Sequence, residues 1–207
     1  MKQLAIIGVG MLAMAAQAAT THVENNGTAT FLELSRGPDV SKFGVGLGIK
    51  PDNNRPGFGG LYFSQTEFKN TSESYGQSNA TIQTLGIRGF SIQGADDEEV
   101  GADMTLGLSH TKVQDYQRTG LSAKATVYLP VINRVTWYLG LALRPTFLSI
   151  DWDPDILTEV GFDTGIDVRL LPNLGLNTYY YHESMLTNDL ESRNLSSGVA
   201  MGINWVW

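Results

Sequence analysis

The sequence predicts an all-β fold: a single antiparallel transmembrane β-barrel of about ten strands, with eight strands as the alternative. Three observations predict it. The chain starts with an apolar export-like stretch, most of the remaining residues alternate between apolar and polar, and the last strand ends on Trp207. No segment after the first stretch is apolar enough for a transmembrane helix, so we expect strands to cross the membrane.

The first residues have the composition of a cleavable signal peptide. Lys2 supplies its positive charge, an apolar stretch follows, and Ala16 with Ala18 forms an A-x-A cleavage pattern. A retained anchor is disfavoured because the stretch is shorter than the ~20 residues that a spanning helix needs. We expect cleavage after Ala18 or one residue later, so that residues 1–18 are the signal peptide and residues 20–207 form one barrel domain.

The first four strands are expected at residues 28–36, 42–50, 57–68 and 80–93. The second is the clearest, because glycines alternate with Phe43, Val45 and Leu47, which leaves one face apolar and the other nearly bare backbone. The first has only a short apolar face. The fourth requires a β-bulge near Gly89 to keep Phe90 on the same face as the apolar residues before it.

The next four strands are expected at residues 99–112, 119–130, 135–148 and 157–171, and the last two at residues 174–184 and 195–207. All show sustained alternation. The runs last about 9–13 residues, close to the 9–11 that a tilted strand needs to cross a bilayer and longer than typical strands of a soluble sandwich. Strand length therefore favours a membrane barrel over a β-sandwich.

Loop lengths and aromatic residues fit the same architecture. If the last strand ends in the periplasm, short turns fall on that side and longer polar loops on the external side, as in bacterial barrels. Aromatic residues at the strand ends would then form two girdles. The expected members are Trp137, Trp205 and Trp207 at the periplasmic ends, and Phe43, Phe68, Phe147 and Tyr180 at the external ends.

Composition and charge exclude several function classes. The formal net charge of -7 and the pI near 4.9 disfavour nucleic acid as a partner, because phosphate binding requires clustered lysine and arginine. The chain has no cysteine, which excludes disulfides, thiolate metal sites, thiol nucleophiles and a lipid-modified N-terminal cysteine. No motif in the sequence indicates a cofactor.

The last strand carries the most specific pattern. Gly202, Trp205 and Trp207 fit a G-x-x-aromatic-x-aromatic ending, which resembles the signal that the outer-membrane assembly machinery reads on its substrates. With the glycine-alternating second strand and the ten-strand layout, the chain resembles YfaZ-type outer-membrane precursors and, more generally, OmpA-like barrels. The resemblance implies an outer-membrane location, with outer-membrane lipid, lipopolysaccharide and the assembly machinery as partners. It brings no catalytic motif, and Trp207 departs from the more usual closing phenylalanine.

Alternation also predicts which polar side chains point into the lumen. They are Arg88, Asp103, Lys124, Arg144, Asp163, Asp167, Arg169, Asn177, Tyr179, Tyr181 and Glu183. In so narrow an interior, charges of opposite sign either pair into a plug or line a small ion-permeable path. We therefore expect an envelope barrel with either a plugged lumen or a narrow porin-like pore. The plug is the simpler interpretation, because buried charges usually survive by pairing.

An outer-membrane enzyme, a protease or lipid A-modifying enzyme with its site at the external rim, is an alternative function. His110 and His182 lie near external strand ends, where a general base would be needed. Ser109 neighbours His110, but adjacent residues of a strand point to opposite faces and cannot form a nucleophile–base pair. We expect no enzyme activity, and the deciding observation is whether both histidines converge with an external carboxylate.

A surface-binding or adhesion barrel that acts through acidic external loops is a further alternative. Asp151, Asp153 and Asp155 could hold Ca²⁺ or Mg²⁺, but the segment lacks the glycine and the bidentate glutamate of a calcium loop. A solvated acidic loop is the simpler explanation. The same holds for the acidic residues 96–99, which fall at an expected periplasmic turn.

Overall fold

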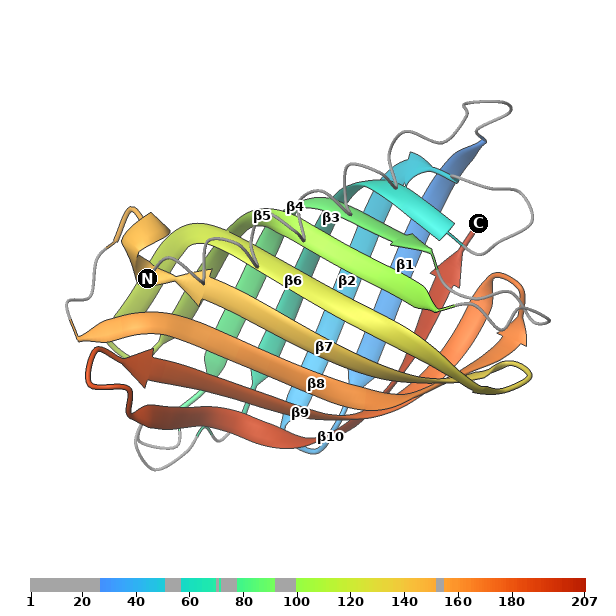
Figure 1. The fold of residues 1–207 in the computed structure, drawn as a ribbon. Coiled ribbons are helices and arrows are strands. Elements are labelled where there is room, and N and C mark those ends of the chain that lie inside the picture. Colours follow the sequence, from blue (N-terminus) through green and yellow to red (C-terminus); the bar gives the residue numbers. More distant parts are fainter. Residues whose placement is uncertain (1–26, 51–56, 70, 72–77, 92–99, 152–154) are drawn as a thin grey trace.

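The chain folds into a closed antiparallel barrel of ten strands in the computed structural model (Figure 1). The structure describes residues 27–50, 57–69, 71, 78–91, 100–151 and 155–207. Each strand pairs with its sequence neighbours, and β1 closes the ring by pairing with β10. The predicted fold class and the ten-strand count are confirmed. The expected signal peptide and its cleavage site lie outside the described residues.

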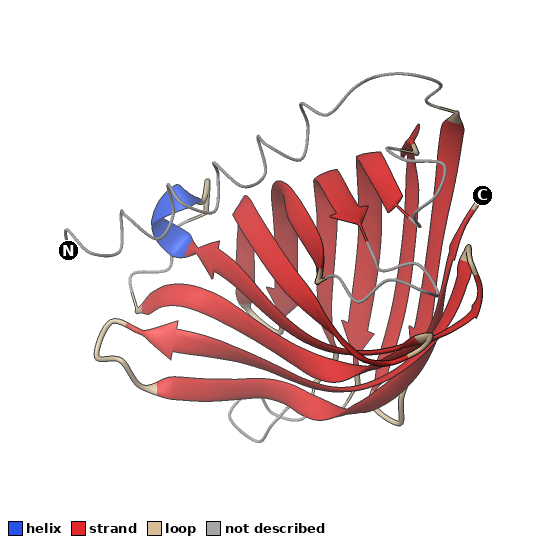
Figure 2. Ribbon diagram, turned by 45° about the vertical axis from the view of Figure 1, so that its right-hand side comes forward, coloured by secondary structure: helices blue, strands red, loops and turns tan. Residues whose placement is uncertain are grey.

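The strands have the following bounds: β1 Thr28–Arg36, β2 Val40–Ile49, β3 Gly57–Phe68, β4 Ala80–Ser91, β5 Gly101–Val113, β6 Tyr116–Ile132, β7 Val135–Pro145, β8 Ile156–Leu171, β9 Leu174–Thr187 and β10 Ser192–Val206. A 3-10 turn, η2 at Thr146–Leu148, follows β7. It lies at the rim opposite the C-terminus (Figure 2). No helix of the described chain is long and apolar enough to span a membrane.

Several strands extend further than expected at the rim opposite the C-terminus (Figure 1). β6 begins at Tyr116, which pairs with Val113 of β5, so most of the expected external loop is hairpin. β9 likewise continues to Thr187. Polar residues can continue a pair of hydrogen-bonded strands beyond the apolar zone, because backbone groups pair with each other in water as well as in an apolar environment. Loss of apolar alternation therefore marks the end of the apolar zone and not the end of the strand.

The two faces of the wall differ as the alternation predicts. Outward positions are apolar and exposed: Leu47 is 66% exposed, and Leu61, its partner across β2 and β3, is 65% exposed. Many large apolar side chains lie on this outer face, including Trp205 and Trp207, whose rings are 4.9 Å apart. An exposed apolar surface of this extent indicates a protein that does not face water along its wall.

Two expectations about aromatic residues are wrong. β3 pairs with β4 in continuous register, Gly59 opposite Gly89, so the predicted bulge near Gly89 is absent from the described strands. Phe90 therefore points inward and is 4% exposed. Phe68, expected in the external girdle, also points inward and is 2% exposed. Both errors have one cause, because the lumen carries apolar layers that the assumption of a polar interior did not anticipate.

These inward apolar residues form two separate layers, one near each end of the barrel. The terminal-end layer lies at the end of the barrel where β1 begins and β10 ends, and consists of Ala29, Phe31, Phe58, Tyr62, Phe90, Tyr128, Tyr138 and Val206. The loop-end layer lies at the other end and consists of Val40, Phe68, Ala80, Ile82, Val113, Ile156, Tyr181, Met185, Leu195 and Ala200. The charged residues of the lumen lie mainly between and beside these layers.

Candidate functional site in the barrel lumen

A cavity of about 140 Å³ occupies the middle of the lumen. Its wall includes residues of both apolar layers, such as Phe31 and Phe68, together with most of the inward charges. A space of this size holds on the order of ten water molecules. The lumen is therefore a small polar chamber with apolar material toward both ends, and its chemistry depends on how the charges are arranged.

The largest ion network joins β1, β2, β4 and β5. Glu33 accepts from Lys42 at 2.6 Å and from Arg88 at 2.9 Å, and the Tyr62 hydroxyl donates to it at 3.0 Å. Arg88 also binds Asp103, at 2.6 Å through one terminal nitrogen and at 3.1 Å through Nε. All four charged side chains are mostly buried. Charge-assisted bonds of this kind offset the cost of removing the ions from water.

Arg88 also connects this network to the terminal-end layer. Its guanidinium carbon lies 4.5 Å from the centre of the Phe31 ring, 4.8 Å from that of Tyr62 and 5.4 Å from that of Phe90. Phe31 in turn contacts Phe58 and Phe90 at ring distances of 5.7 and 5.3 Å. A cation over aromatic faces is attracted to them. One arginine thus holds the polar chamber and the aromatic layer together.

A second network lies toward the loop end. Arg144 binds Glu183 at 2.9 Å and lies 3.7 Å from Glu159. Glu159 is 2% exposed and also accepts from the hydroxyls of Thr111 and Tyr116, at 2.7 and 3.0 Å. These donors and the nearby cation satisfy a carboxylate that would otherwise be costly to bury.

The remaining ion pairs are smaller. Lys124 binds Asp163 at 2.6 Å across β6 and β8. Near the terminal end, Arg169 lies 3.1 Å from Asp167 and donates to the amide oxygen of Asn204 at 3.0 Å. The Asn204 amide nitrogen completes this triangle by donating to Asp167 at 2.7 Å.

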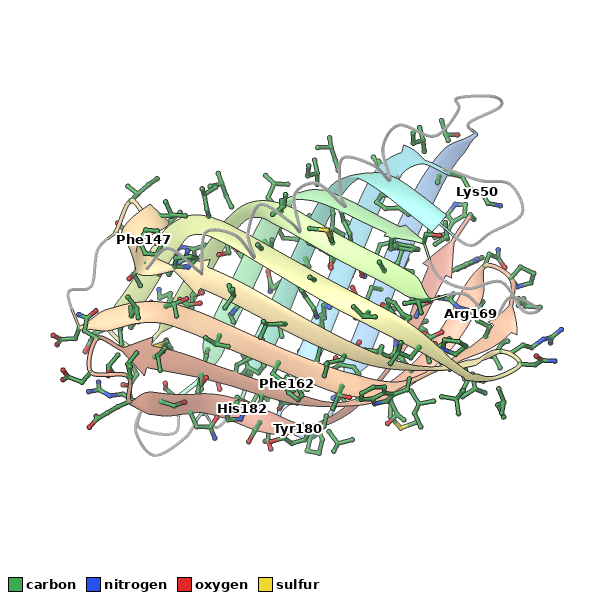
Figure 3. All side chains as sticks on the ribbon, viewed as in Figure 1. Lys50, Phe147, Phe162, Arg169, Tyr180 and His182 are labelled. Carbon is green, nitrogen blue, oxygen red and sulfur yellow. The ribbon has the colours of Figure 1, made fainter. Side chains whose placement is uncertain are left out.

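Most of the predicted lumen residues surround one cavity. Arg88, Asp103, Lys124, Arg144, Asp163, Asp167, Asn177, Tyr179, Tyr181 and Glu183 line it. Arg169 does not line it. It points inward but is held in its triangle with Asp167 and Asn204 at the end that carries the C-terminus (Figure 3).

Sequence reasoning missed several charged residues of the lumen. Glu33 lies on the opposite face of β1 from Leu32 and Leu34, and Lys42 shares its face with the glycines of β2. Glu159 has the same parity in β8 as Asp163. All three lie inside the expected strands, so applying the alternation to every position of those strands would have found them. Arg118 was missed because β6 was expected to begin one residue after it; it is 1% exposed and donates to Ser109 at 2.8 Å.

The residues expected for an enzyme do not converge. His110 and His182 lie on the outer faces of β5 and β9, with His182 beside Tyr180 on the outside of the barrel (Figure 3). Nδ1 of His110 lies 2.9 Å from the hydroxyl of Thr119. Ser109 points inward and is 1% exposed, so it shares no face with either histidine.

The acidic loop does not form a metal site in the described part of the chain. Asp153 lies outside the described residues, as do the acidic residues 96–99. Among the residues that the structure describes, no group of three or more histidine, cysteine or acidic side chains could hold a metal ion. Because Asp153 lies outside the described residues, the candidate site at Asp151, Asp153 and Asp155 stays a prediction.

The C-terminal pattern residues lie on the strand that closes the barrel. Gly202 of β10 faces Ser35 of β1, and a Cβ on Gly202 would lie 2.5 Å from the Ser35 hydroxyl. Trp207 exchanges two backbone hydrogen bonds with Thr30, of 2.8 and 3.0 Å. Trp205 and Trp207 face outward. The pattern thus coincides with the seam of the barrel.

Comparison with known proteins identifies no family. No family model and no curated protein matches the chain, so the YfaZ-type resemblance stays a prediction. Among solved structures, the chain is similar to outer-membrane expressed OmpT of Vibrio cholerae, with 9% identity and a TM-score of 0.38 over 81% of this chain and 56% of that one. It therefore spans just over half the length of that protein.

Two further solved structures are similar over much of the chain. The translocator domain of the autotransporter NalP from Neisseria meningitidis shares 13% identity, with a TM-score of 0.36 over 99% of this chain and 96% of that one. The outer membrane channel DcaP of Acinetobacter baumannii shares 12% identity, with a TM-score of 0.31 over 86% and 62%. At these values the likenesses carry no functional argument, and the fold rests on the strand pairing of this chain.

Proposed function

We propose that this protein is an integral outer-membrane barrel, an envelope component whose lumen is closed by two apolar layers. The observation that carries the proposal is the distribution of inward side chains. Paired charges surround a small central cavity, and an apolar layer lies toward each end of it. The proposal selects the plugged lumen over the open porin-like pore.

The outer surface supports a membrane location. Apolar side chains face outward along every strand, whereas the described outer positions near the loop end include polar residues. One cross-strand row there contains Gln65, Gln83 and His110, with Gln83 donating to Gln65 at 2.8 Å. The next outward row toward the terminal-end layer contains Leu85 and Leu108, which are 60% and 53% exposed. On β4 and β5 the outer face thus changes from polar to apolar between one outward residue and the next, which is typical of a membrane boundary.

The two layers support a closed lumen. Apolar constrictions stop ion flow because water leaves them, and an ion cannot enter a dry segment without its hydration shell. Phe31 is the centre of the terminal-end layer, and Phe68, whose ring lies 5.7 Å from that of Tyr181, belongs to the loop-end layer. Because the layers are in series, either one alone suffices to block conduction.

The test is the conductance of the refolded protein in planar bilayers. We expect no stepwise conductance from the wild type, from Phe31→Ala or from Phe68→Ala, and stepwise conductance from the variant that carries both changes. Phe43→Ala combined with Phe147→Ala is the matched control, because these phenylalanines are 42% and 58% exposed on the outside. That control should stay silent. Conductance of the wild type would favour the porin-like pore.

We also propose lipid and the outer-membrane assembly machinery as partners. The support is the same strand that closes the barrel, since Trp205 and Trp207 sit exposed at its end. Aromatic residues at strand ends favour the membrane interface, where one part of the ring meets lipid and another meets water.

A further inference from the structure

The Lys124–Asp163 pair differs from the other ion pairs of the lumen. Arg88 and Arg144 each bind two carboxylates, and Arg169 belongs to a triangle with Asp167 and Asn204. Lys124 and Asp163, in the part of the chain that the structure describes, are each other's single ionic partner. A pair without further partners is the one that a ligand can separate at the least cost to the rest of the lumen.

This pair is also the one most open to the cavity. The Lys124 side chain is 34% exposed, more than any other member of the lumen ion pairs, although it points inward. Both residues line the cavity. Gly140 lies opposite Asp163 on β7, and a Cβ there would lie 2.6 Å from the carboxylate. The glycine thus leaves the space that the Asp163 carboxylate occupies.

The cavity sets the size of a ligand. Its volume of about 140 Å³ is close to the roughly 150 Å³ of an engineered cavity that binds benzene, so it holds a molecule of about six to eight heavy atoms. Tyr128, Tyr138 and Tyr179 line it and offer ring faces that attract an ammonium group. An anion that separated the pair would leave Asp163 unpaired, and a cation would leave Lys124 unpaired. An unpaired charge in a confined site costs binding free energy.

We propose that Lys124 and Asp163 bind a small zwitterion, whose carboxylate takes the place of Asp163 at Lys124 and whose ammonium takes the place of Lys124 at Asp163. Such a ligand keeps the chamber neutral and pairs every charge. This inference rests on the proposed function, because the cavity is enclosed only if the lumen is closed at both ends.

The test is titration calorimetry of the refolded protein in detergent micelles with 4-aminobutanoate, and with butanoate and butylamine as single-charge probes. We expect 4-aminobutanoate to bind at least about tenfold more tightly than either single-charge probe. Lys124→Gln and Asp163→Asn should each weaken its binding by about tenfold or more, because each removes one charged contact.

Two glycine variants provide the matched control. Gly140→Ala should displace the Asp163 carboxylate and weaken 4-aminobutanoate binding, whereas Gly161→Ala presses a Cβ against Glu183, at 2.5 Å, and should leave binding within about twofold of the wild type. Equal losses in both variants would refute a site at Asp163. Equal affinity for butanoate and 4-aminobutanoate would refute the zwitterion.

The Phe31→Ala, Phe68→Ala double variant is the control for entry of the ligand into the closed chamber. We expect 4-aminobutanoate to reach the site faster in this variant than in the wild type, because both apolar layers are opened. Absence of binding heat in both proteins would overturn the inference. Conductance of the wild type together with selective 4-aminobutanoate binding would instead overturn the closed lumen and leave the site standing, so the two failures are distinguishable.

Discussion

The guanidinium of Arg88 lies 4.5 Å from the centre of the Phe31 ring while its nitrogens bind Glu33 and Asp103. Arg88 therefore both packs against the aromatic layer and neutralises two buried carboxylates. Closure of the terminal end and pairing of the chamber charges depend on the same side chain.

Replacing Arg88 by alanine should lower the free energy of unfolding by about 3–5 kcal/mol, because Glu33 and Asp103 would remain buried with too few cations. Arg88→Lys should lower it by less, since lysine keeps the charge but loses the planar fork and much of the ring contact. Urea unfolding in detergent, followed by tryptophan fluorescence, measures both. An Arg88→Ala variant as stable as Arg88→Lys would contradict this role.

Thr111 tests the burial of Glu159. Its hydroxyl donates to the Glu159 carboxylate at 2.7 Å, so Thr111→Val should cost about 1–3 kcal/mol in the same unfolding assay. Thr105→Val is the control: Thr105 is 9% exposed and also points inward, and no hydrogen bond from its hydroxyl is found among the described residues. If the two substitutions cost the same, the hydrogen bond to Glu159 does not contribute measurably.

Two adjacent glycines of β3 test which face of this strand points into the lumen. A Cβ on Gly60 would lie 2.3 Å from the backbone oxygen of Leu47, whereas one on Gly59 would meet no atom within 4 Å. Gly60→Ala should therefore destabilise the barrel by about 1–3 kcal/mol through overpacking. Gly59→Ala should be close to neutral. The reverse order in unfolding experiments would mean that β3 is turned the other way.

Deleting Trp207 should impair membrane assembly, because it removes the last aromatic residue and two backbone hydrogen bonds to Thr30 at the barrel seam. The measurement is the fraction of protein that becomes integrated into outer membranes of expressing cells. Trp207→Phe keeps the aromatic ending and both backbone bonds, and should assemble normally. Normal assembly of the deletion variant would remove the argument from the C-terminal pattern.

Alternation predicted the strands well because lipid and lumen impose a period of two on every residue that crosses the membrane. It predicted β1 and β3 with the bounds that the structure has, and it directed Asp103, Lys124 and Asp163 toward the cavity that they line. Each of these residues lies in a strand whose apolar residues face outward, so the charged side chain between them has to point into the lumen.

The same rule failed where the interior is apolar. Phe90 was assigned outward by adding a bulge, because a phenylalanine in a lumen had no partner that the sequence could reveal. Its partners, Phe31 and Phe58, come from β1 and β3, and the register that joins them is set by the closed ring. The two apolar layers, on which the proposed closure depends, are tertiary features that no single strand encodes.

Single-cysteine labelling tests the central claim most directly, because the natural chain has no cysteine. Leu85 is 60% exposed on the outside, and Ser64 is 7% exposed and lines the cavity. In lipid vesicles, Leu85→Cys should react with a membrane-soluble maleimide and not with a charged one, and Ser64→Cys should resist the charged maleimide unless Phe31 and Phe68 are both alanine. Rapid labelling of Ser64→Cys by the charged reagent in the otherwise wild-type barrel would contradict a closed lumen.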